Sequence, residues 1–337
     1  MQLSELMPHL IYKFKSESEL VDTILKISER FNFDRDKIDE YVLSEKQVAA
    51  YTCFYGATNI AKLQACLDKI GIEDLSHYEL VDIGCGPATF SLAALSLNAE
   101  QKIIGLESSK LMRDQAAKLL KGLFPGADAN LYESVEKVPR KTNLKRIGLF
   151  GHSANEMEED LIKKIIIKLD LDDVLFIEPG TKYFFEKMRT IRTWLVNSDY
   201  SIIYPCAGGS TCPVPEGDWC HQYIKVSHEH DVERLCQLVK KDRRLMPIIL
   251  HHYSKGNLES RSGELVQRVY PPLKFASSMD ICQLEQGELK LIPLEVVYKG
   301  LGKSQIKALQ KILAGDKIEF EVSKELNNGV WRVTWRN

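Results

Sequence analysis

The stretch Leu80-Val-Asp-Ile-Gly-Cys-Gly-Pro-Ala-Thr-Phe90 decides the fold of this chain. It begins as an apolar run, turns at two glycines and continues into a helix-like segment that reaches Leu97. Glycines let a backbone turn tightly and approach a ligand closely. A second apolar run, Lys102-Ile-Ile-Gly-Leu-Glu107, ends in an acid 25 positions after Asp82. A strand, a glycine turn, a helix and an acid-tipped strand predict half of a Rossmann-like nucleotide site.

The glycine turn resembles the first signature of class I S-adenosylmethionine methyltransferases, in which an acid precedes G-x-G. It departs from the dinucleotide fingerprint G-x-G-x-x-G because Thr89 stands where the third glycine belongs. Gly84 and Gly86 would hold the amino-acid and ribose part of the cofactor, and Glu107 would bind the ribose hydroxyls. Asp82 is expected to orient the turn or to bind the cofactor ammonium through water. The alternative is a tight turn in some other α/β protein.

Short apolar runs alternate with amphipathic segments between residues 78 and 205, and the runs cover residues 79–83, 102–106, 146–150 and 174–177. This alternation predicts a mostly parallel sheet with helices on both faces and a ligand crevice at the carboxyl ends of the strands. The expected fold class is α/β, a Rossmann-like class I methyltransferase sheet. An N-terminal helical region precedes it, and a cysteine-rich metal-binding insertion with a C-terminal β extension follows.

Four regions are expected along the chain: a helical region at 1–75, the Rossmann-like S-adenosylmethionine-binding domain at 76–205, a cysteine-rich cluster-binding region with strands at 206–295, and a C-terminal extension at 296–337. Apolar residues recur at helical spacing in segments 20–31 and 59–70, and Thr58 is a candidate N-cap for the second. The later pattern predicts helices at 230–240 and 303–313, a strand at 247–253, a hairpin at 278–293, and strands at 317–322 and 330–335.

Composition restricts the function less than the motifs do. Hydrophobic residues make up 44% of the chain, and 45 basic against 47 acidic side chains leave a net charge of -2. These values are ordinary for a soluble globular protein and argue neither for nor against nucleic acid. No apolar run approaches the roughly 20 residues of a membrane span, and the N-terminus lacks a signal or transit pattern. We therefore expect no membrane partner, a cytoplasmic location and a monomer.

Three of the eight cysteines crowd into one segment without an apolar core, with the spacing Cys206-x5-Cys212-x7-Cys220. Ordering such a loop is costly without a cross-link, and metal coordination provides one. The spacing favours zinc and an iron–sulfur cluster about equally, and three incidental thiols are the remaining alternative. Cys282 in the predicted hairpin is the best candidate for a fourth ligand. His221, adjacent to Cys220, and the pair His251 and His252 are weaker candidates.

Several segments together resemble a known family. They are the glycine turn, Phe176-Ile-Glu-Pro-Gly-Thr181, Cys212-Pro with Trp219-Cys-His221, Pro271-Pro-Leu-Lys274 and Asp280-Ile-Cys282. They are similar to the methyltransferase-like proteins associated with the small ribosomal subunit, which include mitochondrial assembly factors and bacterial relatives. The resemblance covers roughly residues 45–295. It implies that Cys206, Cys212, Cys220 and Cys282 hold a [4Fe–4S] cluster and that the chain binds ribosomal RNA of an immature small subunit.

The sequence names no certain catalytic residue. The segment Leu149-Phe-Gly-His-Ser-Ala-Asn-Glu156 follows a predicted strand, but it lacks the [DN]-P-P-[FY] signature of base amino-group methylation. His152 and Asn155 are candidate substrate or cofactor contacts, and His152 is also a candidate general base. The alternative for His152 is a polar residue at a strand tip. A non-catalytic assembly factor that keeps the fold is therefore the second functional hypothesis, and a zinc-stabilised methyltransferase with another substrate is the third.

Two groups of basic residues are candidates for contact with RNA phosphates. Lys182, Lys187, Arg189 and Arg192 belong to one predicted helix, and Lys240, Lys241, Arg243 and Arg244 form a short run. The alternative for each group is a solvated surface.

Overall fold

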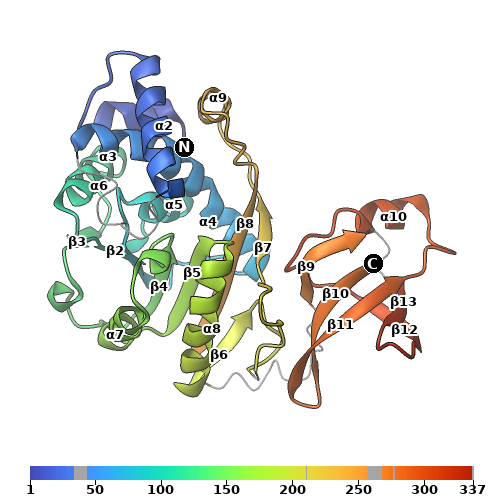
Figure 1. Cartoon of the computed structure of the whole chain (residues 1–337). Coiled ribbons are helices and arrows are strands. Elements are labelled where there is room, and N and C mark those ends of the chain that lie inside the picture. The colour runs from blue at the N-terminus through green and yellow to red at the C-terminus, as the bar shows by residue number, and fades with distance from the viewer. Residues whose placement is uncertain (34–43, 210, 257–267, 276–277, 336–337) are drawn as a thin grey trace. The chain divides into compact units, whose positions relative to one another are not determined.

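The glycine turn follows β1 (Tyr78–Ile83), a strand with parallel neighbours on both sides. These neighbours are β2 (Lys102–Leu106) and β4 (Lys145–Gly151), and β3 (Ala129–Tyr132) pairs with the other edge of β2. The resulting strand order is β3-β2-β1-β4 (Figure 1). The chain moves outward from β1 to β3 and then crosses back to β4, so the order reverses beside β1. Such a reversal places a ligand crevice at the carboxyl ends of these strands.

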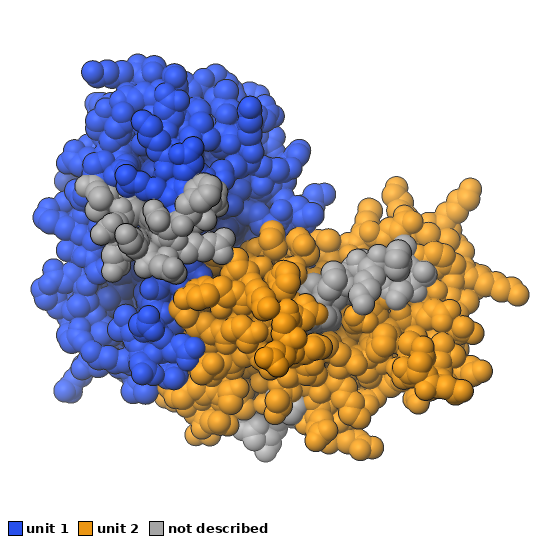
Figure 2. Space-filling model, viewed as in Figure 1, with its two compact units in different colours: residues 1–174, 224–246 blue, residues 175–223, 247–337 orange. Residues whose placement is uncertain are grey.

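The computed structural model describes residues 1–33, 44–209, 211–256, 268–275 and 278–335. The chain divides into two compact units, which Figure 2 shows in different colours. Unit 1 contains residues 1–174 and 224–246, and unit 2 contains residues 175–223 and 247–337. None of the helices in the described parts of the chain is long and apolar enough to cross a membrane.

Unit 1 surrounds its parallel strands with helices. They are α1 (Leu3–Leu6), α2 (Glu17–Phe33), α3 (Glu45–Tyr51), α4 (Ala57–Ile70), α5 (Thr89–Leu97), α6 (Lys110–Leu123), α7 (Glu159–Leu169) and α9 (His230–Leu238). Within this unit α3 packs against α2 and α6, and α4 packs against α5. The strands are apolar on both faces because helices cover both: Val81, Ile147 and Leu149 are fully buried. The helices predicted at 20–31 and 59–70 correspond to α2 and α4.

The predicted N-cap at Thr58 is wrong. α3, a π-helical segment (Thr52–Gly56) and α4 follow one another without an interruption, so no helix starts at Thr58. The Thr58 hydroxyl instead donates to the Tyr55 carbonyl at 3.4 Å, and the residue is buried. A threonine within a helix uses its hydroxyl in this way because the carbonyl of the preceding turn is within reach.

Unit 2 begins within β5 (Asp173–Pro179) and continues with α8 (Lys182–Asn197) and β6 (Tyr200–Tyr204). The strand β8 (Leu245–Lys255) lies between β5 and β6, runs antiparallel to β6 and also pairs with β7 (Gln222–Lys225). Segment 205–221, which joins β6 to β7, contains no helix or strand in its described residues. The sequence pattern predicted this lack of regular structure.

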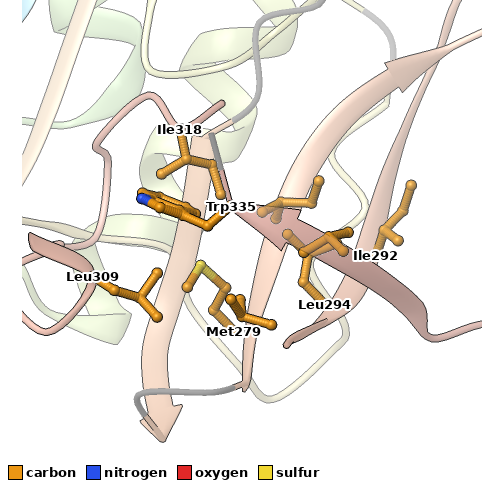
Figure 3. Packing of buried hydrophobic residues seen from close by; sticks show 9 residues of the cluster. Met279, Ile292, Leu294, Leu309, Ile318 and Trp335 are labelled. Carbon is orange, nitrogen blue, oxygen red and sulfur yellow. The ribbon is translucent and has the colours of Figure 1, made fainter. Parts of the chain in front are cut away.

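A second sheet in unit 2 has the strand order β12-β13-β11-β10-β9. Its elements are β9 (Arg268–Phe275), β10 (Ser278–Glu285), β11 (Glu288–Val296), β12 (Phe320–Glu325), β13 (Trp331–Trp335) and the helix α10 (Lys303–Leu309). The predicted hairpin is confirmed, because β10 and β11 are antiparallel from Ser278–Glu295 to Glu285–Glu288. Figure 3 shows the core of this sheet, in which Met279, Ile292, Leu294 and Trp335 pack with Leu309 of α10.

The helix predicted at 303–313 is shorter than expected. It ends at Leu309, and a turn replaces its last residues: the Asp316 carboxylate accepts the Leu313 N–H at 2.8 Å, and Gly315 has a φ of +89°. The strand predicted at 317–322 begins later, at Phe320, because the chain first completes this turn. The apolar spacing predicted where the helix begins but not where it ends. The hydrogen bond from the Leu313 N–H to Asp316, which belongs to the following turn, leaves no mark in an apolar pattern.

Candidate cofactor and metal sites

The glycine turn leaves β1 with two residues in the left-handed region, Gly84 at φ +67° and Gly86 at φ +54°. A Cβ on Gly84 would lie 2.5 Å from the Ser153 Cβ, so this glycine is required by the packing of the turn. A Cβ on Gly86 would meet nothing within 4 Å. The backbone at Gly86 is therefore open to a ligand, while the backbone at Gly84 is closed by the segment after β4.

Asp82 lies behind this turn and is 1% exposed. Its Oδ2 accepts hydrogen bonds from the Ser91 N–H at 2.9 Å and from the Ser91 hydroxyl at 2.7 Å. Ser91 belongs to the first turn of α5, where backbone N–H groups have no partner within the helix. Burial raises the pKa of Asp82 to about 6 against the opposing effect of these hydrogen bonds. Asp82 therefore fixes the start of α5 relative to β1.

Glu107 connects the tip of β2 to the glycine turn. Its Oε2 accepts the Gly86 N–H at 3.0 Å, and its Oε1 accepts the Ser109 N–H at 2.7 Å. Burial raises the pKa of Glu107, while the backbone donors and Arg113 oppose the increase. The structure thus brings Gly84, Gly86 and Glu107 together at the carboxyl ends of β1 and β2. A carboxylate in this position suits ribose hydroxyls, because hydroxyl donors can replace backbone donors.

His152 follows β4 with a φ of +59°, which is unusual for a residue other than glycine. Its Nε2 lies 2.7 Å from the Nζ of Lys62, and its ring stacks on Phe90 at a centroid distance of 6.4 Å. Burial, with Lys62 and Arg243 nearby, lowers the pKa of His152 well below its ordinary value. The neutral ring therefore accepts a hydrogen bond from the ammonium. Asn155 lies in the short 3-10 helix (Ala154–Glu156) that follows.

Lys62 was not predicted from the sequence. It lies on α4, is 2% exposed and meets His152 across 90 positions of sequence. The available signal was a lysine inside a helix whose other residues are mostly apolar or small. That signal identifies neither the partner nor the burial, because both depend on how α4 packs beside the segment after β4.

The four candidate metal ligands gather in unit 2. Cys206, Cys212 and Cys220 lie in segment 205–221, and Cys282 lies in β10. All four line one cavity of about 40 Å³ whose walls are mainly apolar. Burial raises the pKa of the Cys220 thiol, and the other three thiols raise it further. Residues that are up to 76 positions apart in sequence thus share one enclosed space.

Arg192 of α8 lies against this thiol group. It is 3% exposed, donates to the Gly208 carbonyl at 2.9 Å and hydrogen-bonds the Cys206 sulfur. The expectation that Arg192 meets RNA phosphates is wrong, since its guanidinium is buried beside the cysteines. Its helix neighbours contact rings: Lys187 lies over Tyr183, and Arg189 lies over Phe185. A cation inside a cavity of four thiols can offset their negative charge when they are ionised.

The histidines considered as weaker ligands have other contacts. His251 lines the cavity, but its Nδ1 lies 2.8 Å from the Tyr253 hydroxyl, and burial lowers its pKa to about 3. His221 stacks on Trp219 at a centroid distance of 5.7 Å. Within the described residues, no group of three or more His, Cys, Asp or Glu side chains has a geometry that would hold a single metal ion. The thiols are distributed around a cavity rather than around one point.

The remaining cysteines lie elsewhere in the core. Cys53, Cys66, Cys85 and Cys236 are all buried. Burial raises the pKa of Cys66 to about 12, as expected for an inert thiol in an apolar environment. Cys66, Cys85 and Cys236 thus fill space in the core.

The parallel order around β1, the glycine turn and the acid at the tip of β2 together define a Rossmann-like fold of the class I methyltransferase type. The chain belongs to the Rsm22 family. The family model, described as mitochondrial small ribosomal subunit Rsm22, matches residues 45–316. A search of the curated proteins returned no significant match.

Solved methyltransferase structures are similar to this chain at low identity. A putative RNA methyltransferase from Pyrococcus horikoshii is 16% identical with a TM-score of 0.37, and the match covers 60% of this chain and 85% of that one. Magnesium protoporphyrin IX methyltransferase from Synechocystis PCC 6803, with bound SAM, is 12% identical with a TM-score of 0.38, and the match covers 72% of this chain and 100% of that one. Ribosomal protein L11 methylase from Lactobacillus delbrueckii subsp. bulgaricus is 14% identical with a TM-score of 0.33, and the match covers 58% of this chain and 79% of that one. The family assignment does not depend on these similarities.

Proposed function

We propose that this protein is an S-adenosylmethionine-dependent, methyltransferase-like factor that binds ribosomal RNA of the immature small subunit. The observation that carries the proposal is the contact between Glu107 and Gly86, which joins the acid at the tip of β2 to the open glycine turn. Membership of a family described by the small ribosomal subunit supports the RNA partner. We further propose a monomer. The cytoplasmic location stays a prediction. The description of the family as mitochondrial favours the mitochondrion as the alternative location.

The proposed cofactor site mainly has to hold and orient the cofactor. Gly84 and Gly86 would hold the amino-acid and ribose part, and Glu107 would exchange its backbone donors for the ribose hydroxyls. The bound cofactor supplies an electrophilic methyl group, so that alignment of a nucleophile provides much of the rate. His152 and Asn155 are the candidate substrate or cofactor contacts after β4. Because the His152 Nε2 is engaged by Lys62, we assign His152 a positioning role rather than that of a free base.

Methyl transfer separates an enzyme from a binding protein that keeps the fold. Labelled S-adenosylmethionine is incubated with the protein and immature small subunits, with mature subunits and the Glu107→Ala variant as controls. If the unchanged protein transfers label to small-subunit RNA and Glu107→Ala does not, the protein is an enzyme. The absence of label, together with intact cofactor and RNA binding, assigns the protein to the non-catalytic factors. A matched control is Glu100→Ala, an exposed acid outside the turn.

We also propose that Cys206, Cys212, Cys220 and Cys282 hold a [4Fe–4S] cluster. Four thiols on one cavity match the donor set of such clusters, and Arg192 supplies a nearby positive charge. The sulfur ligands of a cluster lie farther apart than the ligands of one ion, which fits thiols that surround a cavity. Zinc with four thiolates is the alternative. Because the predicted cluster replaces an apolar core in segment 205–221, its role here is structural.

The cluster is tested on protein purified without oxygen. We expect about four iron and four sulfide ions per chain and a broad visible absorption. Cys282→Ser should lose most of the iron, whereas Cys236→Ser, which changes a buried core cysteine, should keep it. One zinc ion per chain, or full retention of iron in Cys282→Ser, would contradict the assignment.

A further inference from the structure

A second cavity lies in unit 1, between the end of α9 and the start of β8. It has a volume of about 350 Å³ and is lined by residues between His228 and Arg244. Its charged side chains are Lys240, Lys241, Arg243 and Arg244, together with the acids Glu233 and Asp242. Basic groups therefore outnumber acidic ones, although the whole chain has a net charge of only -2.

One of the acids is already neutralised. Arg244 binds Asp242 through two hydrogen bonds, from Nε to Oδ1 at 3.0 Å and from Nη2 to Oδ2 at 2.8 Å. Across the described residues, no carboxylate pairs with Lys240, Lys241 or Arg243 within 4.0 Å. Three cations thus face the cavity, where Glu233 is the only further acid in the lining. Such an excess of positive charge favours an anionic ligand.

The guanidinium of Arg243 is only partly satisfied by hydrogen bonds. Its Nε is buried and has no hydrogen-bond partner among the described residues, and its Nη2 makes only a long contact of 3.5 Å with the Asn59 Oδ1. Leaving a buried charged donor without a partner costs free energy, which an anion would recover. Lys241 lies close by, and burial together with Arg243 lowers its pKa. The positive charges of Lys241 and Arg243 repel each other, and a bound phosphate would offset this repulsion.

Two aromatic side chains adjoin Arg243. The Arg243 guanidinium lies 6.0 Å from the centre of the Tyr55 ring, and the Tyr55 and Tyr51 rings are 5.2 Å apart. Burial raises the pKa of the Tyr51 hydroxyl, the charge of Glu107 raises it further, and Arg243 opposes the increase, so both charged groups lie near enough to act on Tyr51. Proteins bind single-stranded RNA by combining cations for phosphates with aromatic rings for bases.

We propose that this cavity binds a backbone phosphate of an RNA strand whose neighbouring bases pass Tyr55 and Tyr51 on the way to the cofactor site. The inference rests on the proposed function, because it takes RNA as the partner and names the surface that receives it. Lys240, Lys241 and Arg243 contact the phosphate. The tyrosines provide stacking surfaces, and neither group reads the base sequence.

The test measures the affinity of the full chain for a fluorescent small-subunit RNA transcript at two salt concentrations. Replacing two phosphate contacts in Lys240→Gln/Lys241→Gln should weaken binding at low salt by about tenfold or more and reduce the salt slope by about one to two. Arg243→Gln should have a similar effect. The matched control is Arg234→Gln on α9, an exposed arginine paired with Glu17, which should bind within about twofold of the unchanged protein.

The outcomes separate this inference from the function on which it rests. If the unchanged protein binds RNA and both variants bind equally well, the inference is overturned and the proposed function stands. If the unchanged protein does not bind RNA, both are overturned. If inorganic phosphate displaces the RNA at equal ionic strength, the ligand of the cavity is free phosphate instead of an RNA strand. This result would also overturn the inference. Cofactor affinity should be unchanged in the lysine variant, which shows that the protein is folded.

Discussion

At the scale of single residues, two carboxylates beside the glycine turn have different environments. Asp82 is fully enclosed and binds the start of α5, through Ser91. Glu107 is half-buried, and its two oxygens hold backbone N–H groups that a ligand can replace. We therefore assign Asp82 to the architecture of the turn and Glu107 to the cofactor.

Asp82 should make stability depend on pH. Its folded-state pKa, about 6, exceeds the ordinary value of 3.8, so the protonated form contributes stability below about pH 4 that is lost as the pH rises through 6. Asp82→Asn should remove this loss and gain up to about 2–3 kcal/mol relative to the unchanged protein between pH 4 and pH 7. Urea unfolding at each pH measures the difference. A constant difference, as expected for the exposed control Asp160→Asn, would refute the argument.

The two glycines of the turn should respond differently to alanine. Both have a positive φ, which costs an alanine about 1–2 kcal/mol. In Gly84→Ala the new Cβ also meets Ser153, so we expect a total loss of about 3 kcal/mol or more. Gly86→Ala should show only the smaller cost, since its Cβ meets nothing. Equal losses of unfolding free energy in the two variants would contradict this account.

The residues of this turn were predictable because their spacing is local. Gly84, Gly86 and Glu107 follow from a strand, a turn and the next strand, and the structure brings them together. Ser91 and Lys62 were not singled out for the site, because their roles depend on contacts between elements. The burial of Arg192 was also missed, since a basic residue on an amphipathic helix is usually solvated.

At the scale of elements, segment 205–221 is the least regular part of unit 2. Its described residues form no strand or helix, and its cysteines face a cavity together with Cys282 of β10. The hairpin that carries Cys282 was predictable from its turn, Glu285-Gln-Gly287, and from its alternating pattern. The short strands β3 and β7 were not predicted, because four residues carry too little periodicity to identify a strand.

Removal of iron should release this segment. Without the cluster, segment 205–221 has little apolar surface to keep it ordered, so its conformational entropy favours opening. Limited proteolysis of chelated protein should give a first cleavage between residues 205 and 221, at least about tenfold faster than in the iron-loaded protein. Identical cleavage rates and sites in both forms would contradict a structural role for the cluster.

At the scale of the whole molecule, the two proposed sites belong to different compact units. Gly84, Gly86 and Glu107 lie in unit 1, and all four cysteines lie in unit 2. The mostly parallel sheet of unit 1 followed from the apolar runs and the glycine turn, although the order of its strands did not. The division into units did not, because residues 224–246 return to unit 1 after the chain has entered unit 2, and local sequence does not encode such a return.

Calorimetric titration with S-adenosylmethionine tests the central claim most directly. The full chain should bind one cofactor molecule per chain, and Glu107→Ala should weaken binding by about tenfold or more, because the ribose loses two charge-assisted hydrogen bonds. Iron-free protein should bind with unchanged affinity, since the residues proposed to hold the cofactor, Gly84, Gly86 and Glu107, lie in unit 1 and the four cysteines lie in unit 2. Absence of binding to the unchanged protein, or equal binding by Glu107→Ala, would contradict the assignment of this turn as a cofactor site.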